Sequence, residues 1–336
     1  MYNQTIAYLK QPDTVANWMA IKKWLLPSLP KWAKDVPYQI KAIAVKDACQ
    51  TIMLCKRKFK LSHQWQDASF RTRHDRKQTI FIPKSAVNPA HGAYYTLLGD
   101  IKTYEPIPVP RGDCRLTLWN NRWFVSVSIA ADAKAENQGR TVAVDPGVRT
   151  FATFYSSESC GKIGTGDFSR IQRLCYYLDD IISRMSKAAH KQRHKMKKAA
   201  ERMRWKIRDL IDELHHKTAL FFVTNFDVIF IPKFETSQMA KRGYRKIRSK
   251  SVRSMVTFAH YRFQEFLKFK ASEYGKQVIN TNEAYTSKTC SWSGVVKNIG
   301  GSKFIKDGNI VVDRDYNGAR GILLRALRDS ALPCLI

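Results

Sequence analysis

The chain has 336 residues and a formal net charge of +30, because 58 lysines and arginines outnumber 28 aspartates and glutamates. Its composition, 44% hydrophobic and 12% aromatic, is that of a folded protein and excludes a disordered chain. No apolar run approaches the ~20 residues of a membrane-spanning helix. So basic a chain indicates a polyanionic partner, and its seven widely spaced cysteines are typical of a reducing compartment.

The first 78 residues predict a helical domain. Apolar residues recur at helical spacing within residues 16–24 and again within 38–59, with prolines at 27 and 30 between the two segments. Residues 61–78 are polar and basic. From residue 79 the apolar period changes to two, which predicts a small β-rich domain over residues 79–137. Its expected strands are Thr79–Pro83, Arg115–Trp119 and Trp123–Ile129, and a hairpin turn is expected at Asn120 and Asn121.

A second α/β region begins near residue 138 with two alternating strands, Thr141–Asp145 and Thr150–Tyr155. Helical periodicity over Ser169–Phe222 predicts either a helical hairpin or one long bent helix. The elements expected after it are a strand at Asp227–Ile231, a helix at Val252–Tyr274, a strand at Gln277–Thr281, an irregular segment, and a final helix from about 317 to 328.

Three acidic residues that are far apart in the sequence stand beside these elements: Asp145, Glu235 and Asp315. Singly, each has an ordinary interpretation as a turn residue, a solvated loop acid or a helix cap. Together they are what a metal site assembled by a fold requires, since hard oxygen ligands suit Mg²⁺ or Mn²⁺. In a basic protein, two such ions about 4 Å apart would support phosphodiester hydrolysis.

Four motifs carry a resemblance to a known family: D-P-G-V-R-T-F at 145–151, F-E-T-S-Q-M at 234–239, T-S-K-T-C-S at 286–291 and D-R-D-Y-N-G-A-R-G-I at 313–322. In order and spacing they resemble the RuvC nuclease core of the TnpB/Fanzor family of transposon-encoded RNA-guided DNA endonucleases. The form of the second and fourth motifs is closer to the eukaryotic and giant-virus Fanzor branch. The resemblance is strong over residues 140–330 and weaker over 1–130.

The resemblance implies an α/β fold with a ribonuclease H-like (RuvC) nuclease core and helical insertions, preceded by a helical recognition domain and a small β wedge domain. The implied domains are recognition at 1–78, wedge at 79–137 without its first strands, core with a basic helical insertion at 138–281, a degenerate zinc-ribbon loop at 282–310, and the final motif and helix at 311–336.

The implied function is RNA-guided, Mg²⁺-dependent hydrolysis of double-stranded DNA at one three-carboxylate site by a protein of a transposable element. Asp145, Glu235 and Asp315 would be the catalytic residues and the ligands of two Mg²⁺ or Mn²⁺ ions, while Asp313, Arg314 and Asn317 would support them. The implied partners are a structured, element-derived guide RNA and a DNA target with a short adjacent motif. A monomeric ribonucleoprotein in the nucleus is expected, or in the cytoplasm if the chain is prokaryotic.

The sequence departs from the family pattern in two places. The zinc ribbon keeps only Cys290, with Ser293 where a second ligand is expected, and residues 303–312 hold no Cys or His. Because a tetrahedral zinc site needs four ligands, we expect no bound zinc and a loop held by packing. By comparison with the family, the chain is also expected to begin at the recognition helices, without the opening wedge strands, as a compact gene or a trimmed sequence would.

Two segments predict contact with nucleic acid. The basic helical run at 187–208 contains Glu201 as its single acid and is expected to contact phosphates, with a solvated helix face as the alternative. The basic loop at 241–250 has no acid, and a nuclear localisation signal is its alternative interpretation. The predicted contact residues are Lys187, Lys191, Arg193, Lys195, Lys197, Lys198, Arg204, Lys241, Arg242, Arg245, Lys246 and Arg248.

Two other functions remain open at this stage. A catalytically weak or inert relative would bind DNA under RNA guidance without cutting it. An autonomous RuvC-like nuclease or transposase would use the same core without RNA.

Overall fold

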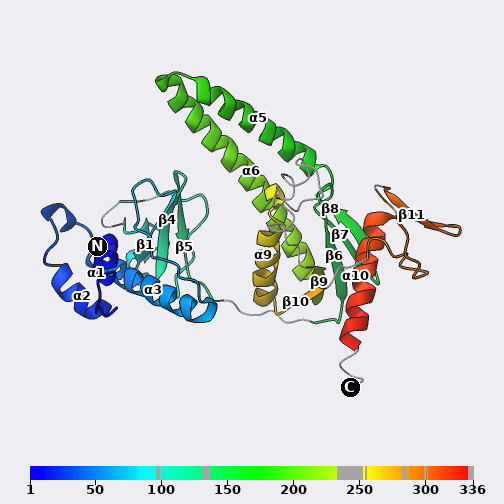
Figure 1. The fold of residues 1–336 in the computed structure, drawn as a ribbon, viewed down its shortest axis with the longest axis horizontal. Helices are drawn as coiled ribbons and strands as arrows, with labels where there is room; N and C mark the ends of the chain where they lie inside the picture. The colour runs from blue at the N-terminus through cyan, green and yellow to red at the C-terminus, as the bar shows by residue number, and fades with distance from the viewer. Residues whose placement is uncertain are drawn as a thin grey trace. The chain divides into compact units, whose positions relative to one another are not determined.

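The protein is described by a computed structural model, in which the chain divides into two compact units, Met1–Ala130 and Ala131–Ile336. Each unit contains both helices and strands, in agreement with the predicted α/β content (Figure 1). The finer domain bounds stay predictions. The structure describes residues 1–95, 99–100, 102–130, 137–232, 253, 256–281, 286–298, 300 and 302–331.

The first unit begins with helices, as the apolar spacing predicted. They are α1 (Tyr2–Leu9), α2 (Trp18–Leu25), a 3-10 turn (Lys31–Ala33) and α3 (Tyr38–Ser62). The side chain of Asn17 caps α2 by accepting a hydrogen bond from the Met19 amide at 3.1 Å. Ile6, Ile21 and Val45, one from each α-helix, are buried together in one core cluster.

A three-stranded antiparallel sheet completes the first unit. Its order is β1 (Lys77–Ile82), β4 (Cys114–Trp119) and β5 (Arg122–Ser126), and a short hairpin of β2 (Val87–Asn88) and β3 (Gly92–Ala93) follows the 3-10 turn Lys84–Ala86. The predicted hairpin turn is confirmed, because Asn120 and Asn121 join β4 to β5 with φ of 44° and 63°. Asparagine tolerates this left-handed conformation better than most residues.

The second unit is built on a five-stranded sheet of order β10-β9-β6-β7-β8. These strands are β10 (Gln277–Thr281), β9 (Val228–Pro232), β6 (Thr141–Pro146), β7 (Ala152–Ser156) and β8 (Cys160–Ile163). β6, β9 and β10 are parallel, whereas β7 and β8 run antiparallel to their neighbours. β6 is the central strand and is nearly completely buried, since Val142, Ala143 and Val144 are all 0% exposed.

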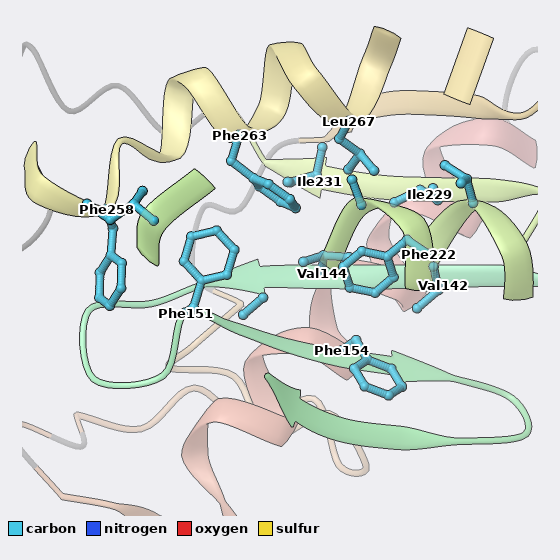
Figure 2. Packing of buried hydrophobic residues seen from close by; sticks show 14 of the residues in the cluster. Val142, Val144, Phe151, Phe154, Phe222, Ile229, Ile231, Phe258, Phe263 and Leu267 are labelled. Carbon is cyan, nitrogen blue, oxygen red and sulfur yellow. The ribbon is translucent and has the colours of Figure 1, made fainter. Parts of the chain in front are cut away.

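Helices cover both faces of this sheet (Figure 1). Of the two interpretations of the long helical segment, the structure shows the hairpin, with α5 (Asp167–Lys187) and α6 (His190–Asn225) joined at an extended Ala188. α6 and α9 (His260–Glu273) pack against one face through Phe222, Phe263 and Leu267, as Figure 2 shows. α10 (Arg314–Ala331) packs on the opposite face through Ile322, Leu323 and Ala326.

The segment predicted to be irregular, residues 282–308, contains the strand β11 (Phe304–Asp307), which forms a hairpin with β12 (Ile310–Asp313) just after it. β12 leads directly into α10, which begins three residues before the predicted start at 317. No helix in the described part of the chain combines the length and apolar character needed to cross a membrane.

Candidate functional site

Asp145 lies near the end of the central strand β6, where the chain reverses into β7. The amide of Gly147 donates a hydrogen bond to the carbonyl of Phe151 at 3.2 Å and closes the reversal. A Cβ at Gly147 would lie 2.5 Å from the carbonyl oxygen of Thr150, so this turn requires glycine. The Asp-Pro-Gly sequence therefore holds a half-buried carboxylate at the carboxyl end of β6.

The carboxylate of Asp145 lies against the first turns of α10. A Cβ built on Gly318 would be 2.8 Å from Asp145 Oδ2, so the carboxylate occupies space that is open because residue 318 has no side chain. Asp315 is three residues earlier on the same helix, and residues at this spacing are neighbours on a helix surface. The fold thus brings the first and third predicted acids to one end of the sheet.

Asp313 and Asp315 share a cationic neighbour that the sequence analysis missed. Lys162 Nζ lies 2.6 Å from Asp313 Oδ2 and 3.5 Å from Asp315 Oδ2. Asp313 Oδ1 also accepts a hydrogen bond from the Asp315 amide at 2.9 Å, and so supports the start of α10. These contacts join Asp313 to Lys162 and to the start of α10, and its supporting role stays a prediction.

The electrostatics of this group follow from partial burial and pairing. Burial raises the pKa of Asp313, but the hydrogen bond from Lys162 and those from the backbone outweigh it, so the pKa lies below its usual value. Burial lowers the pKa of Lys162, but its pairing with both aspartates outweighs that effect and raises the pKa. The lysine is therefore a permanent positive charge beside the carboxylates at neutral pH.

The described carboxylates fit a hard divalent cation in their chemistry, because Asp145, which lies against α10, and Asp315, in the first turn of α10, both offer oxygen ligands. The described residues hold no group of three or more histidine, cysteine, aspartate or glutamate side chains that could hold a metal ion. Glu235, the remaining acid of the predicted set, lies outside the described residues. Its assignment stays a prediction.

Asn317 and Arg314 fix the neighbouring loop to α10. Asn317 is 1% exposed, accepts a hydrogen bond from the Ser291 amide at 2.9 Å and donates one to the Thr289 carbonyl at 2.8 Å. The Arg314 guanidinium donates to the carbonyl of Gly300 at 2.9 Å. Both predicted supporting residues thus connect the loop around residue 290 to the helix that carries Asp315.

This loop is held by direct contacts between protein groups. Cys290 is fully buried, and its carbonyl accepts a hydrogen bond from the Gly294 amide at 2.8 Å. The Ser293 hydroxyl donates to the Asp307 carboxylate, which also pairs with Lys297 at 2.6 Å. These contacts join the turn after Cys290 to the β11–β12 hairpin. That the chain binds no zinc stays a prediction.

Two buried histidines secure the turn that follows Asp145. His260 Nε2 donates a hydrogen bond to the Gly147 carbonyl at 2.9 Å, and His215 Nε2 donates to the Phe258 carbonyl at 2.8 Å. The Phe151 ring is stacked between them, with centroid distances of 5.1 Å and 5.3 Å. Burial lowers the pKa of both histidines to about 4, so both are neutral at pH 7.

We expect the unit to lose stability between pH 6.5 and pH 4. Each histidine must stay neutral to remain buried, whereas in the unfolded chain it binds a proton below about pH 6.5. The stabilisation is therefore complete above pH 6.5 and is lost as the pH falls toward 4. The loss is on the order of 3 kcal/mol per histidine, from pKa values lowered from 6.5 to about 4.

The measurement is the free energy of unfolding by urea at several pH values between 7 and 4.5. His260→Gln should make the pH dependence shallower, because one of the two titrating groups is gone. His194→Gln, at an exposed position of α6, should leave it unchanged. Equal slopes in all three proteins would contradict the assignment.

The basic side chains predicted on the helical hairpin lie on its surface. All seven are exposed, and among the described residues none takes part in an ion pair: Lys187, Lys191, Arg193, Lys195, Lys197, Lys198 and Arg204. Unpaired surface cations are available to phosphates. The other five predicted contacts, Lys241, Arg242, Arg245, Lys246 and Arg248, lie outside the described residues.

Two family models match this chain. The model described as "Cas12f1-like, TNB domain" matches residues 260–322, and the one described as "Probable transposase" matches residues 124–243. The TnpB-like protein L79 of Acanthamoeba polyphaga mimivirus is 27% identical over 196 residues, which cover 55% of this chain and 37% of the relative. The chain is similar to proteins of the TnpB family.

These matches agree with the resemblance found in the four motifs. A second relative, named a putative RNA-guided DNA endonuclease of Streptomyces pristinaespiralis, is 26% identical over 243 residues, covering 69% of this chain and 58% of the relative. The chain spans less than two thirds of the length of either curated relative. A solved Cas12f1–sgRNA–target DNA complex aligns over 96% of this chain and 90% of that chain, at 17% identity and a TM-score of 0.40.

Proposed function

We propose that this chain is a TnpB-family, RNA-guided, Mg²⁺-dependent endonuclease for double-stranded DNA that belongs to a transposable element. The proposed core is ribonuclease H-like, with one RuvC-like site. The observation that carries the proposal is the position of Asp145, at the carboxyl end of the central strand, against α10, which carries Asp315 in its first turn. Similarity to known proteins supports it, because one relative is named a putative RNA-guided DNA endonuclease.

In this proposal Asp145, Glu235 and Asp315 bind two Mg²⁺ or Mn²⁺ ions. Bound ions would supply an activated water and offset the charge of the scissile phosphate. Other residues of the chain hold the segments that carry Asp145 and Asp315 in place. His260 and Gly147 hold the turn after Asp145, and the contact of Asp313 with the Asp315 amide fixes the start of α10.

The proposed partners are a structured guide RNA and a DNA target with a short adjacent motif. The exposed cations of the α5–α6 hairpin support contact with a nucleic-acid backbone. Base pairing with the guide would supply sequence specificity, while the protein reads the adjacent motif. A monomeric ribonucleoprotein in the nucleus, or in the cytoplasm of a prokaryotic host, completes the proposal.

The first test is to express the chain together with the DNA that flanks its gene and to sequence the RNA that copurifies. We expect one discrete RNA with a constant part and a 3′ segment that matches the edge of the element. The purified complex should cut a DNA target that matches this segment in Mg²⁺ and should stop cutting when EDTA is added. A random mixture of cellular RNA, together with cleavage that needs no RNA, would favour the autonomous nuclease instead.

A further inference from the structure

We infer that Lys162 is a positioning residue that serves as a resident counter-charge at the candidate site, where it competes with a divalent cation for Asp315. The inference rests on the proposed function, because it takes Asp315 as a metal ligand. No motif of the sequence analysis contains Lys162, and the strand that carries it was not predicted.

The register of the sheet places Lys162 in one row with Asp145. Asp145 on β6 is directly opposite Thr153 on β7, and Thr153 is directly opposite Lys162 on β8. Residues that are directly opposite across antiparallel strands project from the same face of a sheet. Both side chains therefore project from the face that α10 covers, as Ala143 does two residues before Asp145.

The two contacts of Lys162 differ in strength. The 2.6 Å contact with Asp313 is a short charge-assisted hydrogen bond, whereas the 3.5 Å contact with Asp315 is longer and therefore weaker. Asp313 is itself fixed by the Asp315 amide, and the ammonium group also lies 5.0 Å from the centre of the Tyr316 ring. Asp313 and Tyr316 therefore hold the lysine in place, and the contact with Asp315 is the one that can be exchanged.

A counter-charge is needed here because neighbouring carboxylates repel one another when no cation lies between them. Lys162 is 24% exposed at its side chain, so its interaction with the carboxylates is only partly screened by water. A divalent cation that binds Asp315 would take over the same charge compensation. Lys162 would then keep its hydrogen bond to Asp313 and lose its contact with Asp315.

The test compares Mn²⁺ binding by the wild-type chain and by Lys162→Met, using calorimetric titration and thermal unfolding. In EDTA the variant should unfold at a lower temperature, because the carboxylates have lost their counter-charge. Mn²⁺ should bind the variant about fivefold more tightly, since the competing cation is gone. Added Mn²⁺ should therefore raise the melting temperature of the variant more than that of the wild-type chain.

Lys276→Met is the matched control. Lys276 pairs with Asp227 at 2.5 Å at the other end of β9 and is 9% exposed, so its loss should lower the melting temperature without changing Mn²⁺ affinity. If Lys162→Met does not fold, Lys162→Gln replaces it. Lys162→Arg keeps the charge and should bind Mn²⁺ as the wild-type chain does.

The inference would be overturned if Lys162→Met bound Mn²⁺ no more tightly than the wild-type chain does. The contacts of Lys162 with Asp313 and Asp315 would then be ordinary structural ion pairs. The proposed function would fail in a different way. In that case Asp315→Asn would not weaken Mn²⁺ binding by the wild-type chain. It would not weaken Mn²⁺ binding by the Lys162 variants either. This outcome would overturn both proposals, whereas the first would overturn only the role of Lys162.

Discussion

Replacing Asp145 with asparagine should reduce guided DNA cleavage by about three orders of magnitude or more, which corresponds to roughly 4 kcal/mol of transition-state stabilisation. Asparagine has the same size as aspartate, so the turn at Gly147 and the contact with α10 should persist. The negative charge that would hold a divalent cation is lost. The measurement is the single-turnover rate on a matched target in Mg²⁺, together with the affinity for the copurified RNA, which should not change.

Asp180→Asn is the control for this variant. Asp180 lies on the surface of α5 in an exposed pair with Arg184, so its replacement should leave cleavage unchanged. Cleavage by Asp145→Asn at the wild-type rate would show that the candidate site is not the nuclease site. If the wild-type complex binds its matched target and never cuts it, the better interpretation is that the chain binds DNA under RNA guidance without cleaving it.

The second large effect is expected at Gly318. An alanine Cβ there would lie 2.8 Å from Asp145 Oδ2, closer than such atoms approach, so the carboxylate must move. Because misplacing a reacting group by about 1 Å can cost a factor of 100, we expect Gly318→Ala to lower the cleavage rate by about 10- to 100-fold. Both single-turnover cleavage and the melting temperature should be measured.

Gly321→Ala is the matched substitution in the same helix. Its Cβ would meet Thr286, with the nearest atom at 3.2 Å, and would not meet Asp145. Both substitutions introduce the same good helix former, so a general effect on α10 would appear in both. A loss of cleavage that is equal in the two variants would rule out the steric explanation at Gly318.

Sequence patterns predicted the elements that local rules control. The hairpin turn at Asn120 and Asn121 was predicted because asparagine tolerates positive φ, and the strand Gln277–Thr281 was predicted at its observed bounds. The strand β8 was missed. It spans only four residues and includes Gly161, and none of its residues is fully buried, so it shows no clear alternation of apolar and polar residues.

Sequence alone determined the basic character of this protein, the periodicity of its helices and strands, and the carboxylates that stand beside them. These properties depend on residues that are close together in the chain. The tertiary structure decided which distant groups meet. Lys162 reaches Asp313 across 151 positions, and Gly318 makes room for Asp145. Such contacts depend on the order and register of the strands and on the face of the sheet that α10 covers. Long-range packing of the sheet and helices determines these features, and no local sequence pattern encodes them.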